Sequence, residues 1–580
     1  MRSRTAARPA PKPPLPVKRR TAPSWFRPLL LVLVGIYLMG RFSGAAGDSD
    51  MWWHLAAGKY IWQNHRLPVP DPFAYTTNMG TPFYAGELTT RHFNLTHEWG
   101  MELIYYLVQS SLGFPGLVLF RALLLTVFCG MTGWLAWRRS GGFYRGVAAS
   151  LVAIILASLF AADRAFLATF VLVTVTVAVF DTRRILWALP LIFLLWANLH
   201  GGYLMGWAIA GAYSAEALYL HFRGTPLPDE RKIWMVSALS VLATVLNPNG
   251  VGVLEVMRHY RDSPMQLSIT EWNYPAWWPP DYYNLLVAGT AVTLLWARRR
   301  VRVADWLLFI ALGTASAMAL RNVIFIAFIG PVLLATYLPA WKRPVWVIWE
   351  YAAAVLVVVS LAMGLSRGAM FQLRAAEWRY PAEAADFLIA HGVTGRIFNT
   401  YEGGGYLMWR LWPRQKVFID GRALNESVWD DYVHIAFNAD YKGGKTTNQL
   451  LEQYGIEVIL MPGFDAKGQV YFLPAALADP VQKEWKLVFH DDKSLIYMRH
   501  PPPGVEALPS LEALDALEAQ CNYNVDHGLP VKCAQALGEM FTSIRDWKRA
   551  RKWLEAYLSV DSGNPKARGL LQQLNAAGRY

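Results

Sequence analysis

Near its start the chain reads PLLLVLVGIYLMGRFSG over residues 28–44 and DSDMWWHL over residues 48–55. The first stretch has the length and apolar character of a membrane-spanning helix. The second brings two carboxylates, two tryptophans and a histidine to the end of that helix. Tryptophan is common at a membrane surface, but Asp48 and Asp50 gain nothing from contact with lipid. The two stretches therefore predict a membrane helix with a chemically capable segment at one end.

The composition of the whole chain is that of a membrane protein with a soluble tail. Of its 580 residues, 54% are hydrophobic and 17% are charged, against roughly a quarter charged in ordinary soluble domains. Apolar runs of membrane-spanning length recur up to residue 366 and then stop. We expect about eleven helical spans, at residues 27–46, 113–136, 145–162, 165–181, 185–198, 203–221, 233–247, 283–297, 304–320, 322–338 and 345–365.

The connections between these spans are alternately rich and poor in arginine. Positive charge favours the cytoplasmic side, so residues 1–26, a predicted disordered basic arm, are expected inside and residues 367–580 outside. The net charge of +13 is then a topology signal, and we expect no nucleic-acid partner. The arginine-rich connections are the arm, Arg138-Arg139 with Arg145, Arg183-Arg184, residues 223–232, residues 298–302 and Lys342-Arg343.

This orientation puts a large loop, residues 47–112, on the outside together with several short loops. The large loop is expected to hold two amphipathic helices, near residues 51–63 and 98–108, with tryptophans as anchors at the membrane surface. The inner loops offer little besides positive charge, so a site is expected on the outer face. The outer residues that topology leaves unexplained are Asp48, Asp50, His54, His97, Glu98, Arg164, His200, Glu271 and Arg321.

The tail divides into two parts. Residues 367–500 predict an extracytoplasmic α/β domain with a partly parallel sheet. Gly403-Gly404-Gly405 favours a tight turn. The domain's predicted elements are a helix at residues 380–390 and strands at residues 395–399, 416–420, 456–461, 485–489 and 495–498.

Residues 501–580 begin with the stiff linker PPPG and predict a helical segment similar to one tetratricopeptide unit. A single such unit cannot bury its own face, so it is expected to pack on neighbouring helices or on a protein partner. Cys521 and Cys533 lie in this outward tail, where a disulfide and two free thiols are equally compatible with the sequence.

Asp48 and Asp50 admit three interpretations. A carboxyl group buried at a membrane-side cleft has a raised pKa and can act as a general base. Two carboxylates with His54 also suit a divalent metal such as Mg or Mn. Alternatively, Asp50 caps the following helix, which is worth about 1 kcal/mol, and Asp48 lies in a solvated turn.

Several stretches carry a family resemblance: DMWWHLAAG at residues 50–58, DPFAYT at 71–76, HEW at 97–99, WANLHGG at 196–202, LNPNG at 246–250, EW at 271–272, RN at 321–322, YEGGGYL at 401–407 and VFIDGR at 417–422. With them, most of residues 27–500 resembles the GT-C superfamily of polyprenyl-phosphate-dependent glycosyltransferases. More closely, the chain resembles a group of bacterial membrane proteins related to the protein mannosyltransferase and aminoarabinose transferase families.

The resemblance implies roles for individual residues. Superfamily members use an acidic residue of the first external loop as catalytic base or metal ligand, and the matching positions are Asp48 and Asp50. Asp50 is favoured because it directly precedes Met51 and the Trp-Trp-His motif. The Asp-Glu pair of protein mannosyltransferases is missing from the sequence, which leaves the acceptor class open. The nearby residues His54, His97 and Glu98 join the predicted catalytic set.

A lipid-phosphate donor needs cations beside it, because its leaving group is an anionic phosphate. We assign that role to Arg164, Arg321, His200 and Arg121, with Glu271 as a further outer-face site residue. Snorkelling at helix ends is the alternative for the first two arginines. For His97-Glu98 the alternative is a helix start, and for Glu271 an anchor at the membrane surface. An arginine inside a span, as Arg121 is, is costly unless it is paired.

The resulting prediction is a multi-pass enzyme of the bacterial plasma membrane with a cytoplasmic N-terminus and a periplasmic tail. It would move a hexosyl or pentosyl group from polyprenyl phosphate to a protein, glycan or lipid acceptor. The alternative is a non-catalytic or transport-type protein that acts in envelope assembly through its tail. Transporters usually carry ionisable residues near mid-membrane and interrupted helices in two related halves. In this sequence the ionisable residues lie at the outer ends of the spans, and no internal repeat is found.

Overall fold

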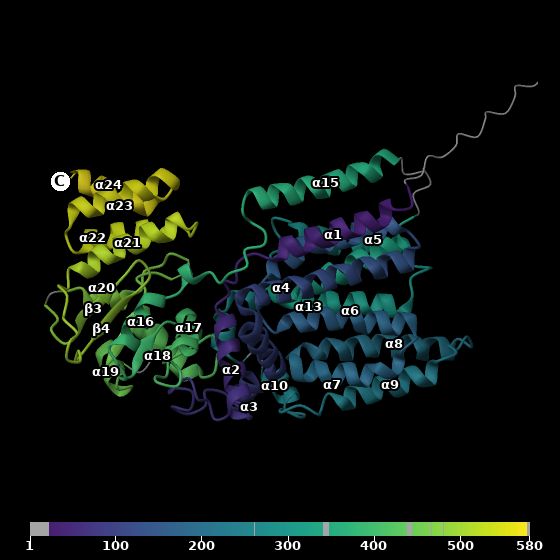
Figure 1. Cartoon of the computed structure of the whole chain (residues 1–580), viewed down its shortest axis with the longest axis horizontal. Helices are drawn as coiled ribbons and strands as arrows, with labels where there is room; N and C mark the ends of the chain where they lie inside the picture. The colour runs from purple at the N-terminus through teal and green to yellow at the C-terminus, as the bar shows by residue number, and fades with distance from the viewer. Residues whose placement is uncertain are drawn as a thin grey trace, which may run out of the picture.

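The computed structural model describes residues 23–259, 262–339, 347–437, 444–465, 467–479 and 481–576. Most of the predicted arm, the Lys342-Arg343 pair and the first two residues of the last predicted span lie outside these ranges. The described chain forms a helical bundle with a separate α/β domain at one end, and the N-terminal helix begins at the opposite end (Figure 1).

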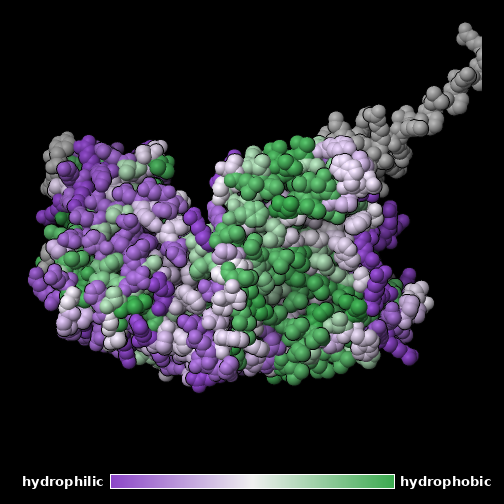
Figure 2. Space-filling view, viewed as in Figure 1, coloured by the Kyte–Doolittle hydropathy of each residue, from purple (hydrophilic) through white to green (hydrophobic). Residues whose placement is uncertain are grey.

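Each predicted span coincides with a helix of the bundle. Figure 2 shows a broad hydrophobic band across these helices, with hydrophilic residues toward both ends of the bundle. Among the described residues, the segments Glu87–Ser140, Phe143–Phe160 and Leu320–Tyr337 contain stretches long and apolar enough to cross a membrane. The full number of spans stays a prediction. The bundle helices are α1 (Phe26–Phe42), α4 (Trp99–Ser140), α5 (Phe143–Ala157), α6 (Phe166–Thr182), α7 (Leu189–Leu199), α8 (Leu204–Phe222), α9 (Glu230–Ala243), α12 (Tyr282–Trp296), α13 (Val303–Met318), α14 (Ile324–Tyr337) and α15 (Val347–Ser366).

Helix α4 joins a predicted loop helix to a predicted span. Gly113 interrupts it with φ 65° and ψ −164°, and Pro115 follows in the next turn. A positive φ is easily adopted only by glycine, and proline removes a backbone donor at the same place. The part before Gly113 is the predicted loop helix, and the predicted span begins at this break.

The large loop contains two further helices, α2 (Asp50–Asn64) and α3 (Glu87–Thr96), at the end of the bundle that faces the α/β domain (Figure 1). The expectation that Trp52 anchors α2 at the membrane surface is wrong. Trp52 is 1% exposed and packs edge-on against Phe114, Tyr380 and Tyr406. Helix α2 is therefore held between the bundle and the α/β domain.

The α/β domain contains a four-stranded sheet in the order β1-β2-β4-β3. Strands β1 (Ile397–Asn399) and β2 (Val458–Met461) pair in parallel, and β3 (Lys486–His490) and β4 (Leu495–Met498) form the predicted hairpin. The partly parallel sheet is thereby confirmed. The domain's helices are α16 (Ala382–Ala390), α17 (Tyr401–Leu411), α18 (Glu426–Phe437), α19 (Thr447–Gln453) and α20 (Phe472–Leu477).

Two expectations for this domain are wrong. Residues 416–420 do not join the sheet, because Val417 makes a parallel bridge to Ala74 of the external loop. The glycines at 403–405 do not form a turn but lie in the first half of α17. A Cβ atom on Gly404 would lie 2.0 Å from the carbonyl oxygen of Ile419, and one on Gly405 would lie 3.0 Å from that of Ser49. These glycines let α17 approach α2 and the 419–421 segment closely.

Arginines at the predicted cytoplasmic end of the bundle form ion pairs with buried acids. Arg139 pairs with Asp181 at 2.5 Å and with Asp305 at 2.9 Å, and Arg302 pairs with Asp181 at 3.2 Å and with Glu216 at 3.0 Å. These pairs connect α4, α6, α8 and α13. The expectation that the inner loops offer little besides positive charge is therefore wrong, because buried acids of α6, α8 and α13 meet these arginines.

The tail is helical, as predicted. Helices α22 (Lys532–Ser543) and α23 (Trp547–Val560) pair around residues 544–546, flanked by α21 (Glu512–Asp526) and α24 (Pro565–Ala576). Cys521 and Cys533 form a disulfide between α21 and α22, which decides the alternative that the sequence left open.

Candidate functional site

The first turn of α2 positions the two carboxylates of the external loop. Asp50 is the first residue of α2, and Ser49 precedes it without a side-chain cap. The backbone N–H of Asp50 donates to Oδ1 of Asp48 at 2.9 Å. The interpretation of Asp50 as the helix cap is therefore wrong, because it is Asp48 that accepts from the turn, and the carboxylate of Asp50 is left for other partners.

Arg164, between α5 and α6, gathers three carboxylates around one guanidinium group. Its Nε donates to Asp48 at 2.8 Å, and its Nη1 lies 3.2 Å from Asp50 and 2.9 Å from Glu271. These side chains remain partly exposed, from 16% for Asp48 to 42% for Glu271. The snorkelling interpretation of Arg164 and the membrane-anchor interpretation of Glu271 are both wrong, since each residue has an ion-pair partner in one cluster.

The environment of Asp50 suits proton transfer near neutral pH. Burial, together with the neighbouring charges of Asp48 and Glu271, raises the pKa of Asp50 to about 7 against the opposing effect of Arg164. A general base works best when its pKa lies near the working pH. A carboxyl group with such a pKa can act as the general base that the sequence predicts at Asp50.

Arg121 has a different role from the one expected. It is 1% exposed, its Nη1 pairs with Asp163 at 2.5 Å, and it donates to the carbonyl oxygens of Phe42 and Gly44 at the end of α1. These contacts satisfy the guanidinium inside the protein. Arg121 joins α1 to the α5–α6 connection and offers no surface to a phosphate.

Arg321 lies in the connection between α13 and α14 and stacks over the ring of Trp272, 4.1 Å from the ring centroid. Among the described residues, no carboxylate lies within ion-pair distance of it. Burial raises the pKa of Glu98 to about 8, and the positive charge of Arg321 acts against this rise. Arg321 is therefore the predicted phosphate-binding arginine whose charge remains unneutralised.

The predicted residues His54, His97, Glu98 and His200 lie together in a second group. His97 Nε2 is 3.6 Å from Glu98 Oε2, and His54 Nδ1 is 3.9 Å from Glu98 Oε1. Sequence reasoning left Glu102 out of the site, yet its Oε1 is 4.0 Å from His54 Nδ1. The spacing of four residues between Glu98 and Glu102 was the available signal, because it places both on one helix face.

Metal binding by Asp48 and Asp50 does not fit this arrangement. Arg164 already occupies the space between their carboxylates, within 3.2 Å of both. Within the described ranges, the side chains grouped closely enough to share a metal ion are His54, Glu98 and Glu102, and His97, Glu98 and His200.

A buried ion-pair network fastens the external loop to the α/β domain beside this region. Arg422 donates to both oxygens of Asp71, at 3.1 and 3.0 Å, and to both oxygens of Asp420, at 2.7 and 2.8 Å. All three side chains are at most 2% exposed. The network therefore joins the DPFAYT stretch to the VFIDGR stretch in the fold.

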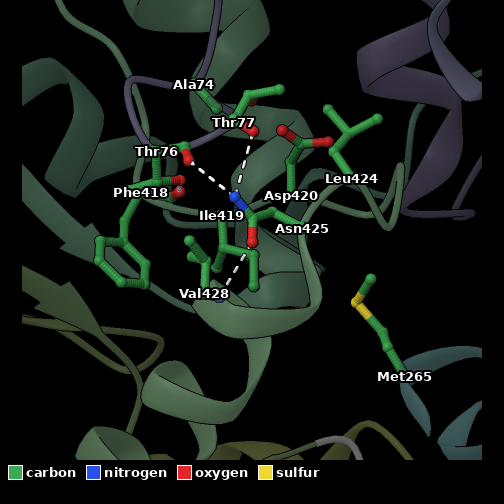
Figure 3. Close-up of a pocket in the computed structure, with 10 residues that line it drawn as sticks. All are labelled: Ala74, Thr76, Thr77, Met265, Phe418, Ile419, Asp420, Leu424, Asn425 and Val428. Atoms are coloured by element: carbon green, nitrogen blue, oxygen red, sulfur yellow. Dashed lines mark hydrogen bonds between the residues drawn. The ribbon is translucent and has the colours of Figure 1, made fainter. Parts of the chain in front are cut away.

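A small pocket lies in the same interface. In Figure 3 the Asn425 side chain stands at its centre, donating to the carbonyls of Thr76 and Thr77 and accepting from the N–H of Val428. The lining combines the external loop, the α/β domain and Met265, and does not include Asp50. The lining residues are Ala74, Thr76, Thr77, Met265, Phe418, Ile419, Asp420, Leu424, Asn425 and Val428.

Comparison with known proteins finds the fold but no close relative. No family model matches the chain, and no curated protein matches it. Among solved structures, the archaeal oligosaccharyltransferase AglB from Archaeoglobus fulgidus, in complex with an inhibitory peptide and a dolichol-phosphate, is similar with a TM-score of 0.50. The identity is 10%, over 93% of this chain and 87% of that one.

A second structure of the Archaeoglobus fulgidus oligosaccharyltransferase, tethered to an acceptor peptide containing the NVT sequon, gives a TM-score of 0.46 at 11% identity, over 84% of this chain and 76% of that one. The likeness to the first structure extends over nearly the whole chain. The predicted architecture, a bundle of apolar helices followed by an α/β domain, is thereby confirmed as a fold.

Proposed function

We propose that this protein is a membrane glycosyltransferase that moves a sugar from a polyprenyl-phosphate donor to an acceptor at the outer end of the bundle. The observation that carries the proposal is Asp50, a carboxylate of near-neutral pKa held at that end by Arg164. The fold shared with a protein bound to a dolichol-phosphate supports the donor class.

The proposed chemistry is a single displacement. Asp50 accepts the proton of an acceptor hydroxyl or amine, whose oxygen or nitrogen forms a bond to the anomeric carbon of the sugar. The bond from that carbon to the phosphate oxygen breaks, and its electrons leave with the polyprenyl phosphate. Arg164 holds Asp50 in place, and Glu271 and Asp48 balance the charge of Arg164. The acceptor class and the sugar stay open.

Arg321 stabilises the leaving phosphate in this scheme, and His200 lies on the same side. A cation with no carboxylate partner keeps its full attraction for an anion, whereas Arg164 and Arg121 are already paired. Asp48 and Asp50 bind no metal ion in this scheme, because the guanidinium group of Arg164 occupies the position between their carboxylates.

The proposed location is the bacterial plasma membrane, with the arm in the cytoplasm and the α/β domain outside. The alternating loop charges support this orientation, as does the placement of α2 and the α/β domain at the end opposite to the start of α1 (Figure 1). The disulfide between Cys521 and Cys533 fits an oxidising compartment. The helical tail is proposed to bind a protein partner.

We expect replacement of Arg321 by Gln to lower kcat/KM for the lipid donor about tenfold to hundredfold, the usual effect of removing a charged hydrogen-bond donor. The measurement is the initial rate of sugar release as a function of donor concentration. Arg258→Gln is the matched control, since Arg258 is exposed on the outer helix α10 (Val253–His259) and should leave the rate unchanged. An unaltered kcat/KM in Arg321→Gln would remove Arg321 from the donor site.

A further inference from the structure

Three buried side chains at the starts of α2 and α4 meet about one helical turn along α2 from Asp50. His54 lies one turn after Asp50 on α2, Glu98 precedes α4, and Glu102 lies in the first turn of α4. They are 2%, 7% and 3% exposed. Gly58 makes this meeting possible, because a Cβ atom there would lie 2.1 Å from the carbonyl oxygen of Glu102.

The group lacks partners for its polar atoms. His54 Nδ1 and Glu102 Oε2 are buried without a hydrogen bond, although a buried polar atom left unpaired costs about 1–3 kcal/mol. Within the described ranges, neither Glu98 nor Glu102 has a lysine or arginine at ion-pair distance; histidines alone approach them. Two buried carboxyl groups and an open imidazole nitrogen thus face one another without a cation.

We infer that His54, Glu98 and Glu102 bind a divalent transition metal, with zinc as the ion that their nitrogen and carboxylate donors suit best. Donor atoms about 2.0–2.2 Å from a tetrahedral zinc ion lie roughly 3.3–3.6 Å from one another. The separations of 3.9 Å and 4.0 Å from His54 Nδ1 to the two carboxylates require only a small closure. The inference goes beyond the proposed function and does not depend on it.

The alternative donor set, which includes His200, is excluded by hydrogen bonding. The backbone N–H of Gly202 donates to His200 Nδ1 at 3.0 Å, and the hydroxyl of Thr169 lies 2.8 Å from the same nitrogen. Because Nδ1 accepts, the neutral ring carries its proton on Nε2. A protonated Nε2 has no lone pair to offer a metal.

His97 has the opposite tautomer and supports the chosen site. Its Nδ1 lies 2.9 Å from the carbonyl oxygen of Phe93 and donates to it, so the Nε2 lone pair points toward Glu98 Oε2, 3.6 Å away. A carbonyl that fixes the ring in this way is the usual second partner of a metal-bound histidine. His97 can therefore hold the Glu98 carboxylate in position, or bind the same metal ion through Nε2 after a small movement.

A metal here would tie α2 to α4 and so fix the helix that begins with Asp50. The test uses the full chain, purified in detergent, stripped with a chelator and titrated with zinc. We expect one zinc ion per chain, with an affinity at least about tenfold lower in His54→Gln and in Glu102→Gln. His200→Gln is the matched control and should bind zinc as the wild type does.

Thermal unfolding gives a second readout that needs no transfer activity. Zinc binding to the folded chain should raise the Tm of the wild type and of His200→Gln, and should leave the Tm of a folded His54→Gln or Glu102→Gln chain unchanged. Two results would overturn the inference: a stripped wild type that takes up no zinc and shows no zinc-dependent Tm, or a loss of zinc in His200→Gln as large as in His54→Gln.

Discussion

Replacement of Asp50 by Asn is expected to lower the rate of sugar transfer by a factor of about 10² to 10⁴, the usual contribution of a general base. The amide keeps the size of the side chain but cannot accept the acceptor's proton. In the wild type the Asp50 carboxylate lies 3.2 Å from Nη1 of Arg164, which is the longest ion-pair distance in the Arg164 cluster. The fold should therefore survive the change, and kcat should fall more than donor binding does.

The control for this experiment is Asp492→Asn, because Asp492 is exposed in the β3–β4 turn. It should transfer sugar at the wild-type rate. An Asp50→Asn enzyme that keeps clearly more than about a hundredth of wild-type activity would show that Asp50 is not the base, since the lower limit for a general base is near 10².

The pH dependence should report the same group. Because burial raises the pKa of Asp50 to about 7, the carboxyl is protonated and inactive as a base well below pH 7. The rate at saturating donor should rise as pH increases through 7 and then level off. A rate that is flat from pH 5 to pH 8 in the wild type would contradict the assignment, and the residual rate of Asp50→Asn should lack this step.

Replacement of Arg422 by Gln is expected to lower the free energy of unfolding by about 3–5 kcal/mol. The change leaves Asp71 and Asp420 buried, each at most 2% exposed, without their cation, and an uncompensated buried charge has a cost of that order. Because Arg422 joins the external loop to the α/β domain, the loss should also release the loop that carries Asp50. The measurement is the urea midpoint of the full chain in detergent, followed by circular dichroism.

The control is Arg551→Gln, at an exposed pair with Glu555 one helical turn away. That pair should contribute at most about 0.5 kcal/mol. If Arg422→Gln shifted the urea midpoint no more than Arg551→Gln does, the network would not be what holds the external loop to the domain.

Local sequence patterns predicted the elements that depend on hydrophobic periodicity. The eleven predicted spans coincide with helices, and the hairpin of β3 and β4 is where the alternation placed it. The failed strand in the α/β domain involves a partner far away in the chain. Residues 416–420 have the pattern of a sheet strand, but Val417 instead bridges to Ala74, more than three hundred residues earlier in the sequence.

The candidate site shows the same division. The residue types and the outer loop charges identified Asp48, Asp50, Arg164 and Glu271, which the structure brings into one cluster. No spacing rule could show that Arg164 would pair with all three acids, or that Arg121 would be neutralised by Asp163. Those pairings depend on how helices far apart in sequence pack at the end of the bundle.

The central claim is that this chain consumes a polyprenyl-phosphate sugar with Asp50 as base. The most direct measurement incubates the purified wild type and Asp50→Asn with a panel of radiolabelled polyprenyl-phosphate sugars, and follows release of the sugar from the lipid. We expect the wild type to consume at least one donor and Asp50→Asn to consume that donor at least about a hundredfold more slowly. Equal consumption by the two proteins, or no consumption of any donor by the wild type, would contradict the claim.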